Sequence, residues 1–164
     1  MSMRSPGVPP VKWERERALD AVAKLVSAFP AEPLGDPRRL MYKPDDHDAK
    51  AVAEIARDKN WLEIADADLA YEAWSLPWTS DEGFLGLLPA FARAALLTEH
   101  EDLLANIKSQ LDPDTNSDRL TRVMARMTEE QRRALLAVVE LWSPSDEPCT
   151  RYWRRSVTRP DRPT

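Results

Sequence analysis

Apolar residues recur every three or four positions along most of the chain, which is the spacing of amphipathic helices. The densest apolar run covers residues 83–97, and Arg93 is its only charged residue. Two apolar stripes share this run, one formed by Phe84, Leu87, Leu88, Phe91 and Ala95 and the other by Leu85, Ala92 and Leu96. A helix that is apolar on two sides is usually buried. We therefore expect a central core helix over about residues 81–97, capped by Ser80 and interrupted by Pro89.

Shorter helical patterns lie on both sides of this core helix. They cover residues 13–28, 46–58, 66–74, 98–111, 119–127 and 128–142. Thr98 with Glu101, and Thr128 with Gln131, have the spacing of the capping box that marks helix N-termini. Residues 112–117 are rich in Asp, Asn and Pro, so we expect a loop there. Because no strand pattern accompanies these helices, the sequence predicts an all-α fold, a compact irregular bundle of six or seven helices around the Pro-interrupted central helix.

The distribution of proline divides the chain into three parts. Fourteen prolines, against four glycines, gather near both ends and between the helical patterns. We expect a flexible N-terminal lead-in over residues 1–11 and a single helical domain over residues 12–143. A Pro- and Arg-rich basic tail over residues 144–164 follows, and its residues 151–155 could dock onto the domain.

Cysteine content and the lengths of the apolar runs bear on the compartment. Cys149 is the only cysteine, so no internal disulfide can form, which fits a reducing compartment. The first ten residues lack the apolar core of an export signal. The run at residues 83–97 is shorter than the ~20 apolar residues of a membrane span and contains a proline and an arginine. We therefore expect a cytoplasmic protein with no membrane span.

The net charge of −5 hides an uneven distribution. Residues 18–148 hold fourteen basic and twenty-five acidic residues, a net charge of −11, whereas residues 149–164 hold five arginines and one acid. An acidic body argues against nucleic acid as a ligand, except weakly through the tail, because phosphates bind basic surfaces. It favours a basic protein partner. The alternative is that the acidic charge only keeps the protein soluble.

Three tryptophans fall in the most acidic stretch of the chain. Between Lys59 and Arg93 there are six acids and no base. Large aromatic side chains in an acidic surface could form a hot-spot patch for a basic protein. The predicted partner-binding residues are Trp61, Glu63, Asp66, Asp68, Glu72, Trp74, Trp78, Asp81 and Glu82. The alternative is that at least two of the three tryptophans fill the core around Phe84 and Phe91.

No motif predicts catalysis. Residues 45–48, with three aspartates and His47, hold metal-type ligands, but consecutive residues at a helix start point in different directions, and Asp is expected there as a cap. His47 and His100 lack the i, i+4 spacing of paired zinc histidines. Cys149 has no histidine near it in the sequence, and no Gly-rich phosphate loop exists. We therefore expect no catalytic residues, no bound metal and no cofactor.

Several residues in a fixed order carry a resemblance to a known group. They are Trp61, the pair Gly83-Phe84, the run Leu88-Pro89-Ala90-Phe91, Leu120, the helix start Thr128-Glu129-Glu130-Gln131, and the pair Tyr152-Trp153. In these features the chain resembles small bacterial helical proteins that are classed as a domain of unknown function. The resemblance covers roughly residues 50–153. It implies a helical fold and supplies no activity.

Three classes of function follow from these observations. The first is a non-enzymatic protein-binding module, such as an immunity-type inhibitor that neutralises a basic toxin through the acidic, Trp-bearing surface. The second is a helical scaffold or regulator that associates with itself. An acid/base or metal-dependent enzyme ranks third, because no pair of carboxylates is placed in an apolar setting by the sequence.

Overall fold

The computed structural model describes residues 12–143 and 146–158, with side chains described from residue 15 onward. Within these ranges the chain forms nine α-helices and one short 3-10 helix, so the all-α prediction is confirmed. In order they are α1 (Lys12–Ala28), α2 (Pro37–Leu40), α3 (His47–Ala56), α4 (Asp66–Tyr71), η1 (Leu76–Trp78), α5 (Asp81–Thr98), α6 (Glu101–Leu111), α7 (Pro113–Met124), α8 (Glu129–Val139) and α9 (Pro148–Thr158). The number exceeds the predicted six or seven because α2 is only four residues long and α9 lies in the segment that was expected to be a tail.

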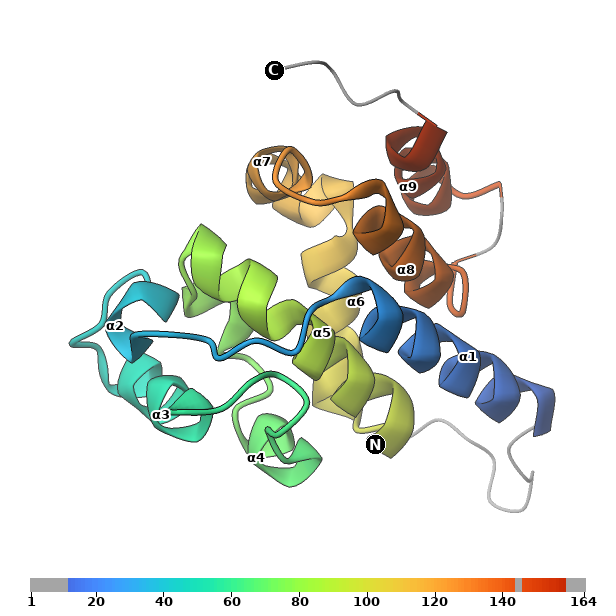
Figure 1. The fold of residues 1–164 in the computed structure, drawn as a ribbon. Coiled ribbons are helices and arrows are strands. Elements are labelled where there is room, and N and C mark those ends of the chain that lie inside the picture. Colours follow the sequence, from blue (N-terminus) through green and yellow to red (C-terminus); the bar gives the residue numbers. More distant parts are fainter. Residues whose placement is uncertain (1–11, 144–145, 159–164) are drawn as a thin grey trace.

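The helix α5 lies at the centre of the molecule, as the sequence predicted. Eleven residues of α5 between Gly83 and Ala95 are buried, and α1, α4 and α6 pack around this helix. The helices α1 and α8 lie side by side, and α9 packs on α8, while α2, α3 and α4 form the opposite end of the molecule (Figure 1). A segment from each half of the sequence therefore covers the central helix.

The boundaries of α5 follow from its caps. The hydroxyl of Ser80 accepts a hydrogen bond from the backbone N–H of Gly83 at 3.0 Å, and Glu99 ends the helix in a left-handed conformation with φ 53°. Pro89 lies inside α5, and helical structure continues on both sides of it instead of dividing there. Because Pro89 has no N–H, the carbonyl of Leu85 loses its intrahelical donor.

Two local predictions were wrong. Thr98 does not cap α6, because it is the last residue of α5 and its hydroxyl donates to the carbonyl of Ala94 at 2.6 Å. Residues 112–117 are not a loop, since Asp112 caps α7 and Pro113 begins it. A non-helical Asn116 marks a kink in this helix. The capping box that opens α8 is confirmed, with both reciprocal hydrogen bonds present.

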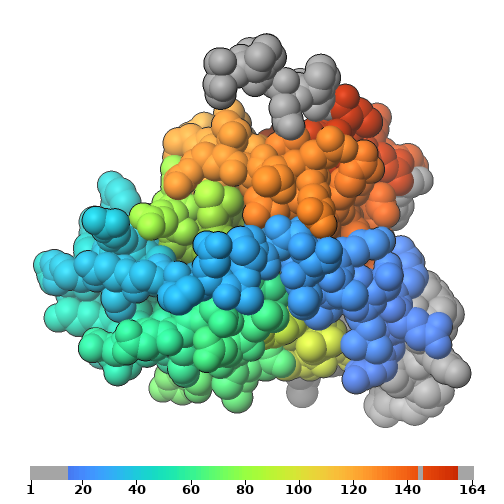
Figure 2. Space-filling view, in the orientation of Figure 1, coloured from blue at the N-terminus to red at the C-terminus, as the bar shows by residue number. Residues whose placement is uncertain are grey.

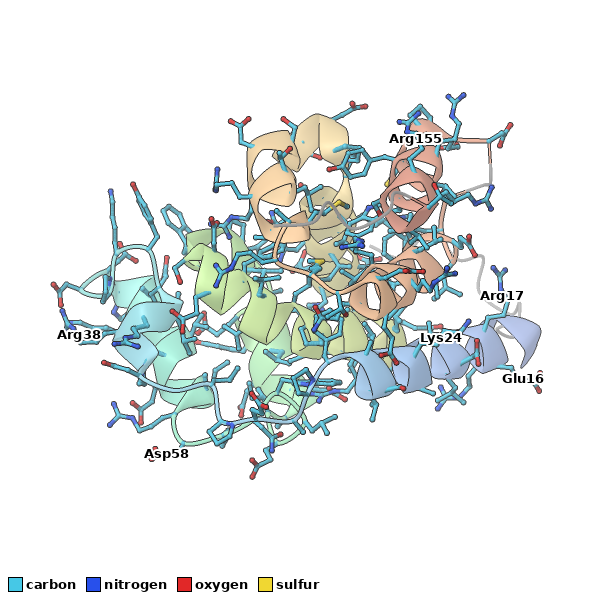
Figure 3. The ribbon with its side chains drawn as sticks, turned by 45° about the horizontal axis from the view of Figure 1, so that its top comes forward. Glu16, Arg17, Lys24, Arg38, Asp58 and Arg155 are labelled. Atoms are coloured by element: carbon cyan, nitrogen blue, oxygen red, sulfur yellow. The ribbon has the colours of Figure 1, made fainter. Side chains whose placement is uncertain are left out.

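The helix α9 occupies part of the segment expected as a basic tail. Trp153 is fully buried, and its indole N–H donates to the carbonyl of Leu111 at 2.8 Å. Arg155 lies on α9 at the opposite end of the molecule from Arg38 and Asp58 (Figure 3). The expected lead-in over residues 1–11 lies outside the described residues, as do residues 144–145 and 159–164. None of the described helices is long and apolar enough to cross a membrane.

Candidate functional site

Trp61 was predicted as a partner-binding residue, but it is buried. Its side chain is 2% exposed, and its indole N–H donates to the carbonyl of Phe29 at 3.3 Å. The ring therefore fills the core beneath the end of α1. Of the three tryptophans in the acidic stretch, this is the only one that is buried.

Two of the predicted acids are neutralised by arginines. Asp66 accepts a hydrogen bond from Nε of Arg93 at 3.1 Å. The guanidinium of Arg93 also donates to the carbonyls of Trp61 at 2.9 Å and Ile64 at 2.6 Å, and it lies over the Trp61 ring. Arg93 is only 8% exposed, so this contact fixes the segment before α4 onto α5. Asp66 is a structural partner of Arg93 and is removed from the binding surface.

Asp81 lies beside arginines of α7. Nε and Nη2 of Arg122 donate to its two carboxylate oxygens at 2.8 and 3.2 Å, and Nε of Arg119 lies 3.7 Å away. The hydrogen bond from Arg122 lowers the pKa of Asp81, as do the charges of Arg122 and Arg119, against the opposing effect of burial. The sequence shows no base near Asp81, but the fold supplies one from forty-one residues away.

The remaining predicted residues do lie at the surface. Trp74 is 54% exposed and Trp78 is 49% exposed. Glu63, Asp68 and Glu82 are exposed, and Glu72 is half-buried and accepts a hydrogen bond from the hydroxyl of Ser75 at 3.0 Å. The nine predicted residues therefore separate into six at or near the surface and three that hold the fold together.

Two tyrosines extend the exposed aromatic set. Tyr71 at the end of α4 is 89% exposed and Tyr42 is 72% exposed. The backbone N–H of Tyr42 donates to the carbonyl of Trp78 at 2.9 Å, which brings these two residues together across thirty-six positions of sequence. We call Tyr42, Tyr71, Trp74 and Trp78 the aromatic surface. Neither tyrosine belongs to the predicted set, whose aromatic members are all tryptophans, although Tyr71 lies among the same acids in the sequence.

The other candidate chemistry of the sequence has structural roles. Asp46 caps α3 by accepting from the backbone N–H of Asp48 at 3.0 Å. Over the described residues, no group of three or more metal-type side chains comes together. Burial, and after it the charges of Asp112, Asp114 and Glu147, raises the pKa of Cys149 to about 11. At neutral pH this thiol is protonated, so it is a poor nucleophile.

A groove lies on the face where the connector between α1 and α2 crosses α5. Its volume is about 260 Å³. Most of its lining is apolar, and the polar lining side chains are Glu32, Glu82, Arg126 and Gln131. In Figure 2 the connector crosses this face in blue, below the orange residues of α7 and α8. Two of the predicted partner-binding residues, Glu82 and the buried Trp61, line the groove, and none of the exposed aromatic residues does.

The architecture is an all-α domain built on a buried, proline-containing central helix, with exposed aromatic side chains beside it. The model of a family of unknown function (DUF6714) matches residues 41–154, so the chain belongs to this family. The resemblance to a domain of unknown function is thereby confirmed. Comparison with curated proteins and with solved structures gave no significant match.

Proposed function

We propose that this protein is a non-enzymatic binding module that recognises a basic protein through the aromatic surface. The observation that carries the proposal is the exposure of Tyr42, Tyr71, Trp74 and Trp78. Only three other large apolar side chains of the described residues are comparably exposed. Exposed aromatic side chains commonly mark interaction sites, because water leaves them readily on contact.

The charge around the aromatic surface favours a basic partner. Glu63, Asp68 and Glu72 share its segment, and none of them forms an ion pair with the described residues. Arginine and lysine side chains of a partner can pair with such carboxylates and can lie over exposed tryptophan faces. The fold already uses this contact internally, where the guanidinium of Arg93 lies 5.7 Å from the Trp61 ring centroid. An inhibitor that neutralises a basic toxin is one form of such a module.

The test compares the wild type with Trp74→Ala/Trp78→Ala in capture from a native lysate, followed by titration of the purified partner. We expect one basic protein to be retained at low salt and released at high salt. Its affinity should fall at least ~30-fold in the double variant, which is the loss of a hot-spot residue worth about 2 kcal/mol. The matched control is Leu19→Ala/Val26→Ala on α1, where two equally exposed apolar side chains are removed.

Three outcomes contradict the proposal. The first is that no defined partner is retained at low salt. The second is that the captured partner binds both double variants equally well. The third is that sedimentation shows the wild type to be a concentration-dependent oligomer and the tryptophan variant to be a monomer, which would make the aromatic surface a contact between copies of a self-associating scaffold.

A further inference from the structure

Two residues of the aromatic surface, Tyr42 and Trp78, lie next to each other on the solvent side of the fold. Met41 and Thr79 form an isolated antiparallel bridge, and the backbone N–H of Tyr42 donates to the carbonyl of Trp78 at 2.9 Å. The bridged residues Met41 and Thr79 are both buried. Because successive side chains beside such a bridge point to opposite faces, the neighbouring Tyr42 and Trp78 face solvent, in agreement with their exposure. They form one pair that is built from two separate parts of the chain.

Arg119 of α7 holds the segment that carries Trp78. Its Nη1 donates to the hydroxyl of Thr79 at 3.1 Å, and its Nη2 donates to the carbonyl of Thr79 at 2.5 Å. Thr79 is fully buried and directly follows Trp78, so these hydrogen bonds fix the backbone at the base of the exposed ring. The backbone at Trp78 and Thr79 is therefore held by two separate segments of the chain, one through Arg119 and the other through Tyr42.

Arg119 itself is covered by the protein. Its side chain is 14% exposed, its guanidinium lies 5.1 Å from the ring centroid of Phe84, and its Nε lies 3.7 Å from the carboxylate of Asp81. A side chain in this position has little surface left for a partner, and its positive charge would repel a basic one. Any favourable effect of Arg119 on binding must therefore act through the residues that it holds.

We propose that Arg119 is a positioning residue of the aromatic surface, which holds Tyr42 and Trp78 as one rigid pair in the free protein. Aromatic side chains that already have their bound arrangement lose less conformational entropy on association. A basic partner therefore binds this pair more tightly than it would bind the same rings on a loose segment. The role of the pair in binding rests on the proposed function, whereas its rigidity is a property of the free protein.

The first test uses the full chain without a partner and compares Arg119→Met with Arg122→Met. Arg122 is the matched control, because it comes from the same helix and bonds the carboxylate of Asp81 but makes no hydrogen bond to residues 76–79. Amide hydrogen exchange, followed by NMR, reports on the hydrogen bond from Tyr42 to Trp78. Relative to amides in the middle of α8, exchange at Tyr42 should accelerate about tenfold in Arg119→Met, the effect of losing one hydrogen bond on local opening.

The same ratio should be unchanged in Arg122→Met. If exchange at Tyr42 accelerates in Arg119→Met only in step with the amides of α8, Arg119 has a general role in stability and the proposal is wrong.

The second test measures affinity for the captured basic partner, and the sign of the change is informative. Both variants remove one positive charge, which on electrostatic grounds alone should strengthen binding of a basic protein. We expect Arg119→Met to weaken binding about three- to tenfold, the cost of ordering one or two side chains on association, and Arg122→Met not to weaken it. Arg119→Lys keeps the charge but not the planar fork of donors, so it should restore little of the loss. Equal or tighter binding of Arg119→Met would overturn the proposal.

A milder variant covers the case in which Arg119→Met does not fold. Thr79→Val removes only the hydroxyl that accepts a hydrogen bond from Arg119, and it should show both effects to a smaller degree.

A double-variant comparison shows whether Arg119 acts through Trp78. In a Trp78→Ala background, Arg119→Met should have a much smaller effect on affinity than in the wild type, and an equal effect in both backgrounds would overturn the positioning role. The proposed function can fail separately. If the wild type retains no partner while Arg119→Met still accelerates exchange at Tyr42, the proposed function is wrong and the positioned pair stands.

Discussion

Substitution of Gly83 by alanine tests how closely α2 approaches the central helix. A Cβ at this position would collide with the carbonyl oxygen of Leu40 and lie 2.6 Å from its carbonyl carbon. Both are backbone atoms, so no side-chain rotation relieves the overlap. The backbone N–H of Ser80 donates to the same carbonyl at 3.0 Å, so moving Leu40 away also breaks that hydrogen bond.

The expected magnitude for Gly83→Ala follows from three opposing effects. Alanine in a helix gains about 1 kcal/mol over glycine. Overpacking in a close-packed core costs typically ~1–3 kcal/mol or more, and a broken hydrogen bond adds about 1 kcal/mol. Because the collision is with backbone, we take the upper part of this range and expect a net loss of about 2–3 kcal/mol. In a protein of this size that lowers Tm by roughly 4–12 °C.

The assay is thermal and urea denaturation followed by circular dichroism, with Gly86→Ala as the control. The same substitution three residues further along α5 meets only the Leu34 side chain, so its helix gain and its contact nearly cancel, within about 1 kcal/mol. If Gly83→Ala unfolds at the same temperature as the wild type or higher, the close approach of Leu40 to α5 is refuted.

Three further predictions concern buried and paired side chains. Replacing Arg93 by Met leaves two backbone carbonyls without donors, so the free energy of unfolding, measured by urea denaturation, should fall by about 3–5 kcal/mol. The control is Arg133→Met, which removes an exposed ion pair within one helix and should change the free energy of unfolding by less than ~0.5 kcal/mol. The hydrogen bond from Arg122 lowers the pKa of Asp81 in the folded protein. The stabilisation from this pair is therefore complete at a pH above the ordinary carboxyl pKa of about 4, and it is lost as the pH falls through the lowered pKa of Asp81. The stability difference between the wild type and Asp81→Asn should therefore be present at pH 7 and close to zero near pH 2. Cys149, with its pKa raised to about 11, should react with iodoacetamide at pH 8 roughly a hundredfold more slowly than an unstructured thiol, and a rate equal to that of a free peptide would contradict its burial.

The features predicted correctly from the sequence are those that depend on neighbouring residues. Ser80 and Thr128 cap their helices as expected, because a cap involves only the following turn. The two apolar stripes of α5 identified the buried helix for a similar reason, since their spacing along one helix determines its faces. Thr98 shows the limit of this reasoning. Its spacing to Glu101 fits a capping box, but α5 extends one residue further than expected, and the hydroxyl of Thr98 donates to the carbonyl of Ala94 within that helix.

The candidate surface was predicted less well because its charges are paired through tertiary contacts. Asp66 and Asp81 occur in a stretch with no basic residue, yet each meets an arginine that follows it by twenty-seven or forty-one positions. Local pattern also cannot distinguish Trp61 from Trp74, since both stand among acids and small apolar residues. Trp61 is buried because its ring packs at the end of α1, where the carbonyl of Phe29 accepts a hydrogen bond from the indole N–H.

The folded unit begins earlier in the chain than the region matched by the family, because α1 is part of the folded unit. The match begins at residue 41, whereas α1 ends at Ala28 and contributes Ala21 and Leu25 to the hydrophobic core between α5 and α8. A fragment cut at residue 41 would leave the apolar sides of these two helices open to water and prone to aggregate. Domain boundaries for expression or for grafting this fold should therefore begin no later than residue 12.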